Sequence, residues 1–103
     1  MTKLIKIIKS EKPLKKWLAI FKLDNGKEKK VHFGYNNKKD KNNDYTLHGD
    51  KERREKYRKR TINQIKNPNT TPLSPSYLSY YILWGDSKNI KTNIKDYRKK
   101  FDL

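Results

Sequence analysis

The side chains best suited to acid–base or metal chemistry in this sequence are two histidines, one of them placed between two carboxylates. His32 and His48 are the only histidines, and Asp44 and Asp50 flank His48. Imidazole and carboxylate groups ligate zinc and exchange protons near neutral pH. Zinc sites, however, ordinarily combine several Cys or His residues at tight spacing, and the chain has no Cys. We therefore expect no enzyme activity, metal or cofactor, with His32 on a strand face and His48 closing the loop before a helix.

A second group that could do chemistry is a cluster of cations within ten residues. It comprises Lys51, Arg53, Arg54, Lys56, Arg58, Lys59 and Arg60, with Tyr57 among them. Such cations contact phosphates, and a tyrosine ring can stack on a base. On a helix, Arg53, Tyr57 and Arg60 share a face, and lysines nearer the N-terminus, Lys12, Lys15 and Lys16 among them, would give support. The alternative is a charged helix that faces only solvent.

The charge of the whole chain supports an anionic partner. Its 103 residues include 27 Lys and Arg against 11 Asp and Glu, for a formal net charge of +16. A surplus of this size attracts polyanions before specific contacts form. Residues 1–60 hold 20 of the basic and 8 of the acidic residues, so +12 of the +16 precedes Thr61. Between Thr61 and Gly85 the only charged residue is Lys66, which makes this aromatic stretch the predicted centre of the core.

The length and composition favour one small domain. Hydrophobic residues make up 32% of the chain and charged residues 37%, but 12% aromatic residues still provide a core. The apolar run Leu4–Ile8 is interrupted by Lys6. It is therefore too short and too charged for a signal sequence or a membrane span. We expect a soluble intracellular protein that uses no membrane.

Three strands are expected over residues 3–35, arranged as an antiparallel meander. Asn25-Gly26 favours a two-residue hairpin loop, and pairing Asp24 with Lys27 would place Ile20 opposite Val31 and Leu18 opposite Phe33. The sheet carries four large aromatic residues, Trp17, Phe21, Phe33 and Tyr35. Exposed aromatic residues would suggest an RNA-binding sheet, but the pattern of the common RNA-recognition fold is absent, so packing in the core is the favoured interpretation.

Helices are expected in the remainder, which makes the fold class α+β. Residues 36–49 read as a polar loop, followed by the basic helix over residues 50–66, which Pro68 ends. On its apolar arc Arg54 and Arg58 accompany Tyr57, so these two cations could support the fold instead of a ligand. Ser74 and Pro75 begin an apolar helix over residues 74–84, and Ser87 caps an amphipathic helix over residues 87–101.

Two segments resemble a family of small basic proteins of uncharacterised function encoded by nucleocytoplasmic large DNA viruses. They are VHFGY with DYTLHGDKERREKYRKR, and LSYYILWGDSKNIKTNIKDYRKKFDL, in the range from about Val31 to Leu103. The resemblance implies a viral origin and no known enzymology. It would place the protein in the virion or in the infected host cell, either in a cytoplasmic viral factory or in the nucleus.

Together these features predict a non-enzymatic viral protein that binds nucleic acid, DNA more than RNA, through backbone phosphates without sequence specificity. The alternative is a virion structural or assembly protein that docks on acidic viral proteins through exposed aromatic residues such as Tyr77, Tyr80 or Trp84. The sequence leaves open the oligomeric state, and whether Arg54 and Arg58 are structural or bind a ligand.

Overall fold

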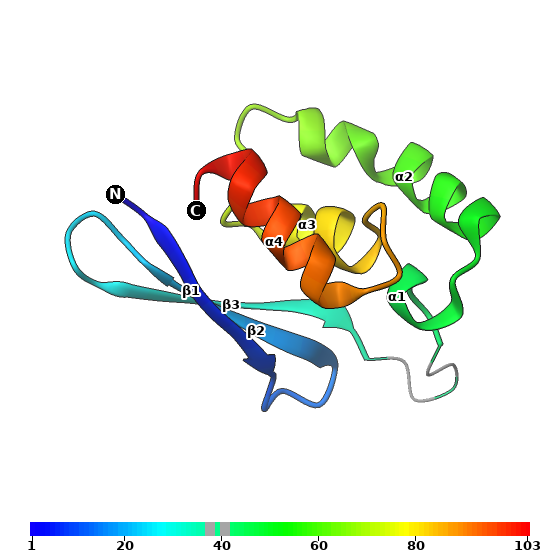
Figure 1. Cartoon of the computed structure of the whole chain (residues 1–103), viewed down its shortest axis with the longest axis horizontal. Coiled ribbons are helices and arrows are strands. Elements are labelled where there is room, and N and C mark those ends of the chain that lie inside the picture. Colours follow the sequence, from blue (N-terminus) through cyan, green and yellow to red (C-terminus); the bar gives the residue numbers. More distant parts are fainter. Residues whose placement is uncertain (37–38, 40–41) are drawn as a thin grey trace.

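Three antiparallel strands form a single sheet at the N-terminal end of the chain, as predicted. The computed structural model describes residues 1–36, 39 and 42–103. Strands β1 (Lys3–Lys9), β2 (Lys15–Lys22) and β3 (Glu28–Tyr35) lie in the order β1-β2-β3 (Figure 1). Helices follow them, so the predicted α+β class is confirmed.

The hairpin between β2 and β3 has a different register from the one expected. Ala19 pairs with Val31 and Trp17 with Phe33, one position away from the predicted pairs. Leu23 and Lys27 close the turn instead of Asp24 and Lys27, since the Leu23 nitrogen donates to the Lys27 oxygen at 2.8 Å. The loop therefore has three residues, and Gly26 at φ +83° supplies the left-handed position that such a loop requires. The one-residue shift exchanges the residues that lie directly opposite one another across the hairpin.

The predicted polar loop over residues 36–49 contains a short helix, which corrects that assignment. Part of the loop, residues 37–38 and 40–41, lies outside the described residues. Helix α1 (Tyr45–His48) begins at Asp44, whose carboxylate accepts from the Thr46 nitrogen at 3.0 Å. Tyr45 is buried, so this segment contributes to the core.

The basic helix forms as expected, as α2 (Lys51–Lys66). The Asp50 carboxylate accepts from the nitrogens of Glu52 and Arg53, which satisfies two donors that the first turn would otherwise leave without a partner. The helix ends just before Pro68, which lacks the backbone donor needed to continue it.

The apolar helix begins as predicted but changes its hydrogen-bonding pattern halfway. Ser74 caps α3 (Pro75–Leu78), and the chain continues directly as the π-helix η1 (Ser79–Leu83). The Trp84 nitrogen donates to the Ser79 oxygen at 3.0 Å, five residues back. Such single π turns often occur at functional sites.

The last helix begins three residues later than expected, as α4 (Ile90–Phe101). Its cap is Asn89, whose side chain accepts from the Lys91 and Thr92 nitrogens, whereas Ser87 was predicted. Ser87 lies outside the helix because Asn93 bonds both its nitrogen and its oxygen, which bends the chain there.

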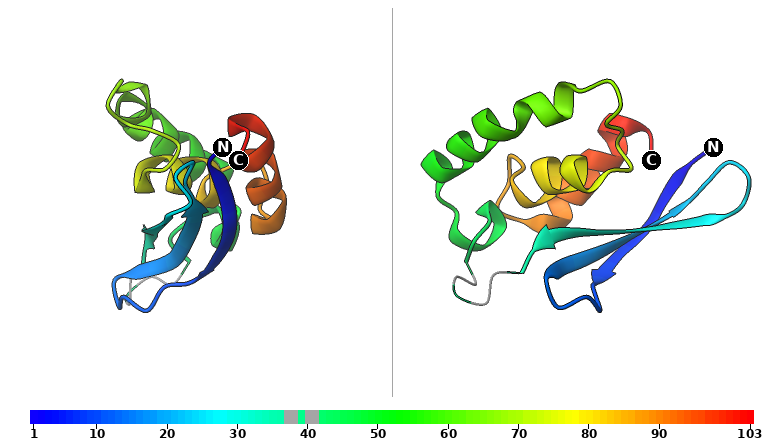
Figure 2. Two further views of the ribbon diagram at one scale, coloured as in Figure 1. Left: turned by 90° about the vertical axis from the view of Figure 1, so that its left-hand side faces the viewer. Right: turned by 180° about the vertical axis from the view of Figure 1, so that it is seen from behind.

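The helices cover one face of the sheet (Figure 2). The continuous segment Pro75–Leu83 is central, because it contacts β3, α2 and α4. Its Leu78, Ile82 and Leu83 are almost fully buried, as are Phe21 and Phe33 of the sheet. The part of the charge-poor segment that lies in the core is therefore Pro75–Leu83, whereas many of the residues before it are exposed. None of the helices in the described part of the chain is long and apolar enough to cross a membrane.

A buried asparagine joins the end of this central segment to α4. Asn93 is 2% exposed, and its amide donates to the Ile82 oxygen at 2.8 Å and to the Ser87 oxygen at 2.6 Å. Its own oxygen accepts from the Ser87 nitrogen at 3.0 Å. Gly85 lies against it, and a Cβ there would be 2.2 Å from the Tyr81 oxygen. Asn93 thus satisfies backbone groups that the helix end leaves in the interior.

Replacing Asn93 by Ala should lower the free energy of unfolding by about 2–4 kcal/mol, because it leaves buried backbone groups without partners. Urea denaturation followed by circular dichroism measures this. The matched control is Asn63→Ala on the exposed side of α2, where the free energy should change by less than about 0.5 kcal/mol. Equal effects of the two substitutions would contradict the role of Asn93.

Candidate nucleic-acid interface

Two of the seven cations clustered in the first ten residues of α2 make contacts within the protein. The Arg58 Nε donates to the backbone oxygen of Trp84 at 2.9 Å, and its Nη2 pairs with the carboxylate of Asp86 at 2.9 Å. Arg54 Nη1 donates to the backbone oxygen of Asp86 at 3.2 Å, and its guanidinium lies 4.6 Å from the centre of the Tyr45 ring. These are the two arginines that the helical arc placed on the apolar side. These contacts within the chain favour the structural role for the two arginines over ligand binding.

Tyr57 is also part of the packed interior. Its ring stacks on Trp84, with centroids 4.3 Å apart and an angle of 10° between the planes. Burial raises the pKa of the Tyr57 hydroxyl above its usual value. Because Trp84 already covers one face of the ring, Tyr57 forms part of a wall and is not a free platform for a base.

The exposed cations of α2 point in different directions. At 100° per residue, Arg53 and Arg60 flank Tyr57, and Lys56 lies next to them. Lys51 and Lys59 lie on the other exposed sides of the helix. Arg53, Lys56, Tyr57 and Arg60 line one hollow of about 240 Å³. The structure thus brings together the trio predicted from the i, i+4 and i+7 spacing, with one further cation.

The three N-terminal lysines expected to support binding also differ in whether they are internal or exposed. Lys16 is internal, because its ammonium pairs with Asp44 at 2.5 Å and its side chain is only 13% exposed. Lys15 is exposed at the beginning of β2, and Lys12 is exposed in the turn before it. Of the three, Lys15 and Lys16 approach the cations of α2, whereas Lys12 does not.

These parts meet in a groove between α2 and the adjacent ends of β2 and β3, which we call the basic groove. Its main part is about 380 Å³ in volume, with Ser76, Ser79, Leu83 and Trp84 at its base. It shares Asn43, Tyr57, Arg60 and Trp84 with the smaller hollow, so the two are continuous. Among the described residues that line it, the cations are Lys15, Lys16, Arg53, Lys56 and Arg60, and the one carboxylate is Asp44. The groove is therefore strongly positive.

Tyr35 lines this groove and was wrongly assigned to the core. Two-residue alternation places it on the same face as Phe33, yet Phe33 is fully buried and Tyr35 is 59% exposed. Gly34 between them has φ +82°, outside the range of a strand, and a Cβ there would lie 2.8 Å from Leu83. A glycine inside a predicted strand was the signal that the alternation could fail. The other three aromatic residues of the sheet are buried or partly buried against the core, as expected.

The histidines and their neighbouring carboxylates make hydrogen bonds within the chain. His32 Nδ1 lies 2.7 Å from the Ser10 hydroxyl on the sheet, and His48 Nδ1 accepts from the Asp50 nitrogen at 2.8 Å. Asp44 and Asp50 cap α1 and α2. No group of three or more possible metal ligands occurs among the described residues.

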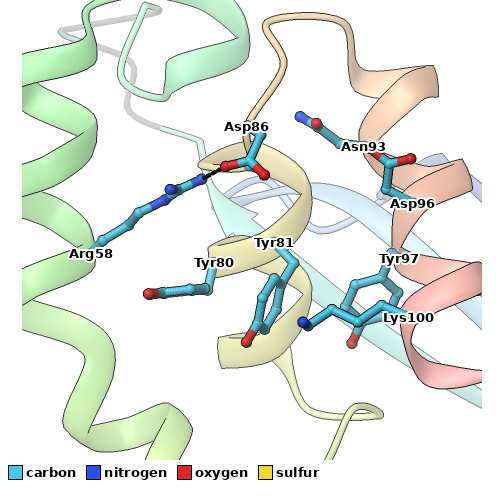
Figure 3. A pocket seen from close by; sticks show the side chains of 9 residues that line it. Arg58, Tyr80, Tyr81, Asp86, Asn93, Asp96, Tyr97 and Lys100 are labelled. Atoms are coloured by element: carbon cyan, nitrogen blue, oxygen red, sulfur yellow. Dashed lines mark hydrogen bonds and ion pairs between the residues drawn. The ribbon is translucent and has the colours of Figure 1, made fainter.

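A second cavity, of about 250 Å³, lies on the other side of η1 (Figure 3). Tyr80 and Tyr81 approach it from η1, and Tyr97 and Lys100 approach it from α4. Its two cations face two carboxylates: Arg58 pairs with Asp86, and Asp96 lines the same cavity as Lys100. Lys100 also lies 5.7 Å from the centre of the Tyr81 ring. The charges of this cavity are balanced within the protein, unlike those of the basic groove.

The fold and the groove define a small basic α+β protein with a positive groove between its basic helix and its sheet. A family model described as a family of unknown function (DUF5754) matches residues 5–61, and the chain belongs to this family. The match begins within β1 and includes the rest of the sheet and all the cations of the basic groove, but not α3, η1 or α4. No curated protein and no solved structure matches the chain.

Replacing Arg58 by Lys should lower the free energy of unfolding by about 1–2 kcal/mol, because an ammonium cannot make both the Trp84 and Asp86 bonds of the guanidinium. Arg60→Lys is the control on the same helix and keeps the same charge. It should change the free energy by less than about 0.5 kcal/mol. Urea denaturation of both variants checks the assignment, and an equal loss in both would contradict it.

Stability should also fall at alkaline pH. Burial raises the pKa of Tyr57, Tyr81 and Tyr97 in the folded chain. Above about pH 10 the unfolded chain therefore binds fewer protons than the folded chain, and the two more buried tyrosines, Tyr57 and Tyr97, each lower the free energy of unfolding by up to about 1.4 kcal/mol per pH unit. Below that pH their contribution is fully present.

Tyr57→Phe tests this alkaline loss, because the ring and its stacking remain while one ionisation is removed. Denaturation at pH 8, 10 and 11 should show a shallower decline in the variant than in the original protein. The lysines deprotonate equally in both, so identical declines would show that Tyr57 is not involved.

Proposed function

We propose that this protein binds nucleic acid through the phosphate backbone, without sequence specificity and without catalysing a reaction. The observation that carries the proposal is the basic groove, which is lined by five cations from β2 and α2 and, among the described residues, by one carboxylate. That carboxylate, Asp44, is 3% exposed and already paired with Lys16, and the Glu52 carboxylate outside the groove lies 3.7 Å from the Lys56 ammonium. The cations still outnumber these two carboxylates, so a polyanion in the groove would meet a positive field.

The arrangement of the cations favours an anion with repeating charges, such as a phosphate backbone, over a single small anion. Arg53, Lys56 and Arg60 succeed one another along α2, and Lys15 lies across the groove. Positive side chains in a row match successive phosphates, and their neutralisation releases counterions from the nucleic acid. None of these features reads base edges, so binding would not depend on sequence. The resemblance to proteins of large DNA viruses favours DNA, in the virion or in the infected cell.

The alternative partner, an acidic viral protein, receives less support from the structure. Its anchors were to be exposed aromatic residues, but Trp84 is 9% exposed and Tyr77 packs on the core. Tyr80 contacts Tyr81 and lies near Arg58. Interface anchors need to be available to a partner, and these three rings are engaged within the chain.

The salt dependence of binding tests the proposal. Fluorescence anisotropy with a labelled 20-nucleotide DNA, single-stranded or annealed, should show affinity that falls steeply with salt. About four phosphate contacts on a duplex, one for each groove cation other than the internal Lys16, would weaken binding roughly 150-fold between 50 and 200 mM salt. If neither form of DNA shows salt-dependent binding, the proposal is wrong.

A triple variant locates the contacts. Changing Arg53, Lys56 and Arg60 to Gln should reduce the slope of log affinity against log salt by about 3. The matched control changes Lys91, Lys95 and Lys99 of α4 to Gln, which removes the same charge from exposed positions outside the groove. Equal effects of the two triple variants would show that net charge alone governs binding.

A further inference from the structure

We infer that the basic groove takes single-stranded nucleic acid, with Tyr35 as the platform on which an unpaired base stacks. This inference rests on the proposed function and adds to it the form of the nucleic acid. It is carried by the position, exposure and support of one aromatic ring. Proteins that bind single strands combine a positive groove with aromatic rings that stack on the bases.

Tyr35 has the exposure that such a platform needs. Its side chain is 59% exposed, whereas the other two aromatic residues that line the groove, Tyr57 and Trp84, stack on each other. A large exposed aromatic side chain loses favourable burial unless something covers it. In the groove, Tyr35 is therefore the ring most available to a ligand.

The cations stand where the phosphates of a stacked nucleotide would lie. Lys15 is the direct cross-strand partner of Tyr35 in the β2–β3 ladder. Arg60 lines the same groove from α2, on the opposite wall. A nucleotide whose base covers Tyr35 would thus have a cation available on either side for the phosphates that flank it.

The backbone beneath Tyr35 is held by hydrogen bonds although its side chain is exposed. The Asn43 amide donates to the Tyr35 oxygen at 2.9 Å. The next residue, Asn36, donates from its nitrogen to the Leu14 oxygen at 3.0 Å and from its side chain to the Pro13 oxygen at 3.2 Å. A ring on a fixed backbone loses less conformational freedom when a ligand binds.

A duplex could not use this ring. In double-stranded DNA the faces of the bases are covered by their neighbours, so stacking on a side chain requires an unpaired or extruded base. The phosphates of a duplex could still reach the cations at the rim. The groove should therefore bind both forms through charge, and single strands more tightly through the additional contact with Tyr35.

The experiment compares a fluorescein-labelled 20-nucleotide oligothymidine with a 20-base-pair duplex by anisotropy, at equal salt. The single strand should bind more tightly, and Tyr35→Ala should weaken its binding roughly 5- to 100-fold, with little effect on the duplex. Tyr35→Phe, which keeps the ring, should restore binding. Tyr80→Ala is the control for loss of a ring outside the groove.

The outcomes separate the inference from the function on which it rests. Equal binding of both forms with the usual salt dependence, together with no effect of Tyr35→Ala, would overturn the single-strand inference and leave phosphate binding intact. Absence of binding to either form would overturn both. Circular dichroism of Tyr35→Ala should match that of the original protein, since the side chain is exposed. A second measurement is ultraviolet crosslinking to a single strand that contains 5-iodouracil. The crosslink should map to Tyr35, and crosslinks confined to other residues would contradict its role.

Discussion

The fold depends on the hydrogen bonds that the backbone carbonyl groups at the C-terminal end of η1 accept from side chains of other helices. A helix end leaves carbonyl groups without partners, and in the interior water cannot replace them. Here three side chains from two other helices supply the donors. Asn93 of α4 bonds the Ile82 oxygen, Arg58 of α2 bonds the Trp84 oxygen, and Arg54 bonds the Asp86 oxygen. Because α2 and α4 both meet at this point, it fixes their positions relative to the central segment, and through that segment to the sheet.

This arrangement explains why the number of cations on α2 overstates its capacity to bind an anion. The guanidinium is the side chain best suited to this task, since it stays charged, donates in several directions and packs on aromatic rings. Arg58 and Arg54 use all three properties, with Tyr80 and Tyr45 as their rings. The cations that remain at the surface of α2 include both Lys and Arg, and those beside Tyr57 line the basic groove.

The sequence was sufficient to predict most of the elements, but not helix α1, the π-helix η1 or the details that tertiary contacts decide. The meander, the basic helix and the cap Ser74 follow from local patterns, and they are confirmed. Asn25-Gly26 fits a loop of either two or three residues, because Gly accepts a positive φ in both, so the register could not be derived from it. Ser87 and Asn89 are both good caps, and the choice of Asn89 depends on Asn93, which holds Ser87 outside the helix.

The two cavities on either side of the central segment differ in how their charges are balanced. In the cavity of Figure 3 two cations face two carboxylates, so the protein itself supplies the counterions. In the basic groove five cations accompany one carboxylate among the described lining residues, and one further carboxylate, Glu52 of α2, pairs with Lys56 from outside the groove. Like charges held together destabilise a fold unless another molecule neutralises them. In the basic groove the excess of cations lies next to the exposed ring of Tyr35, whose backbone is held by hydrogen bonds. This combination suits the proposed ligand, nucleic acid, which carries both phosphates and aromatic bases.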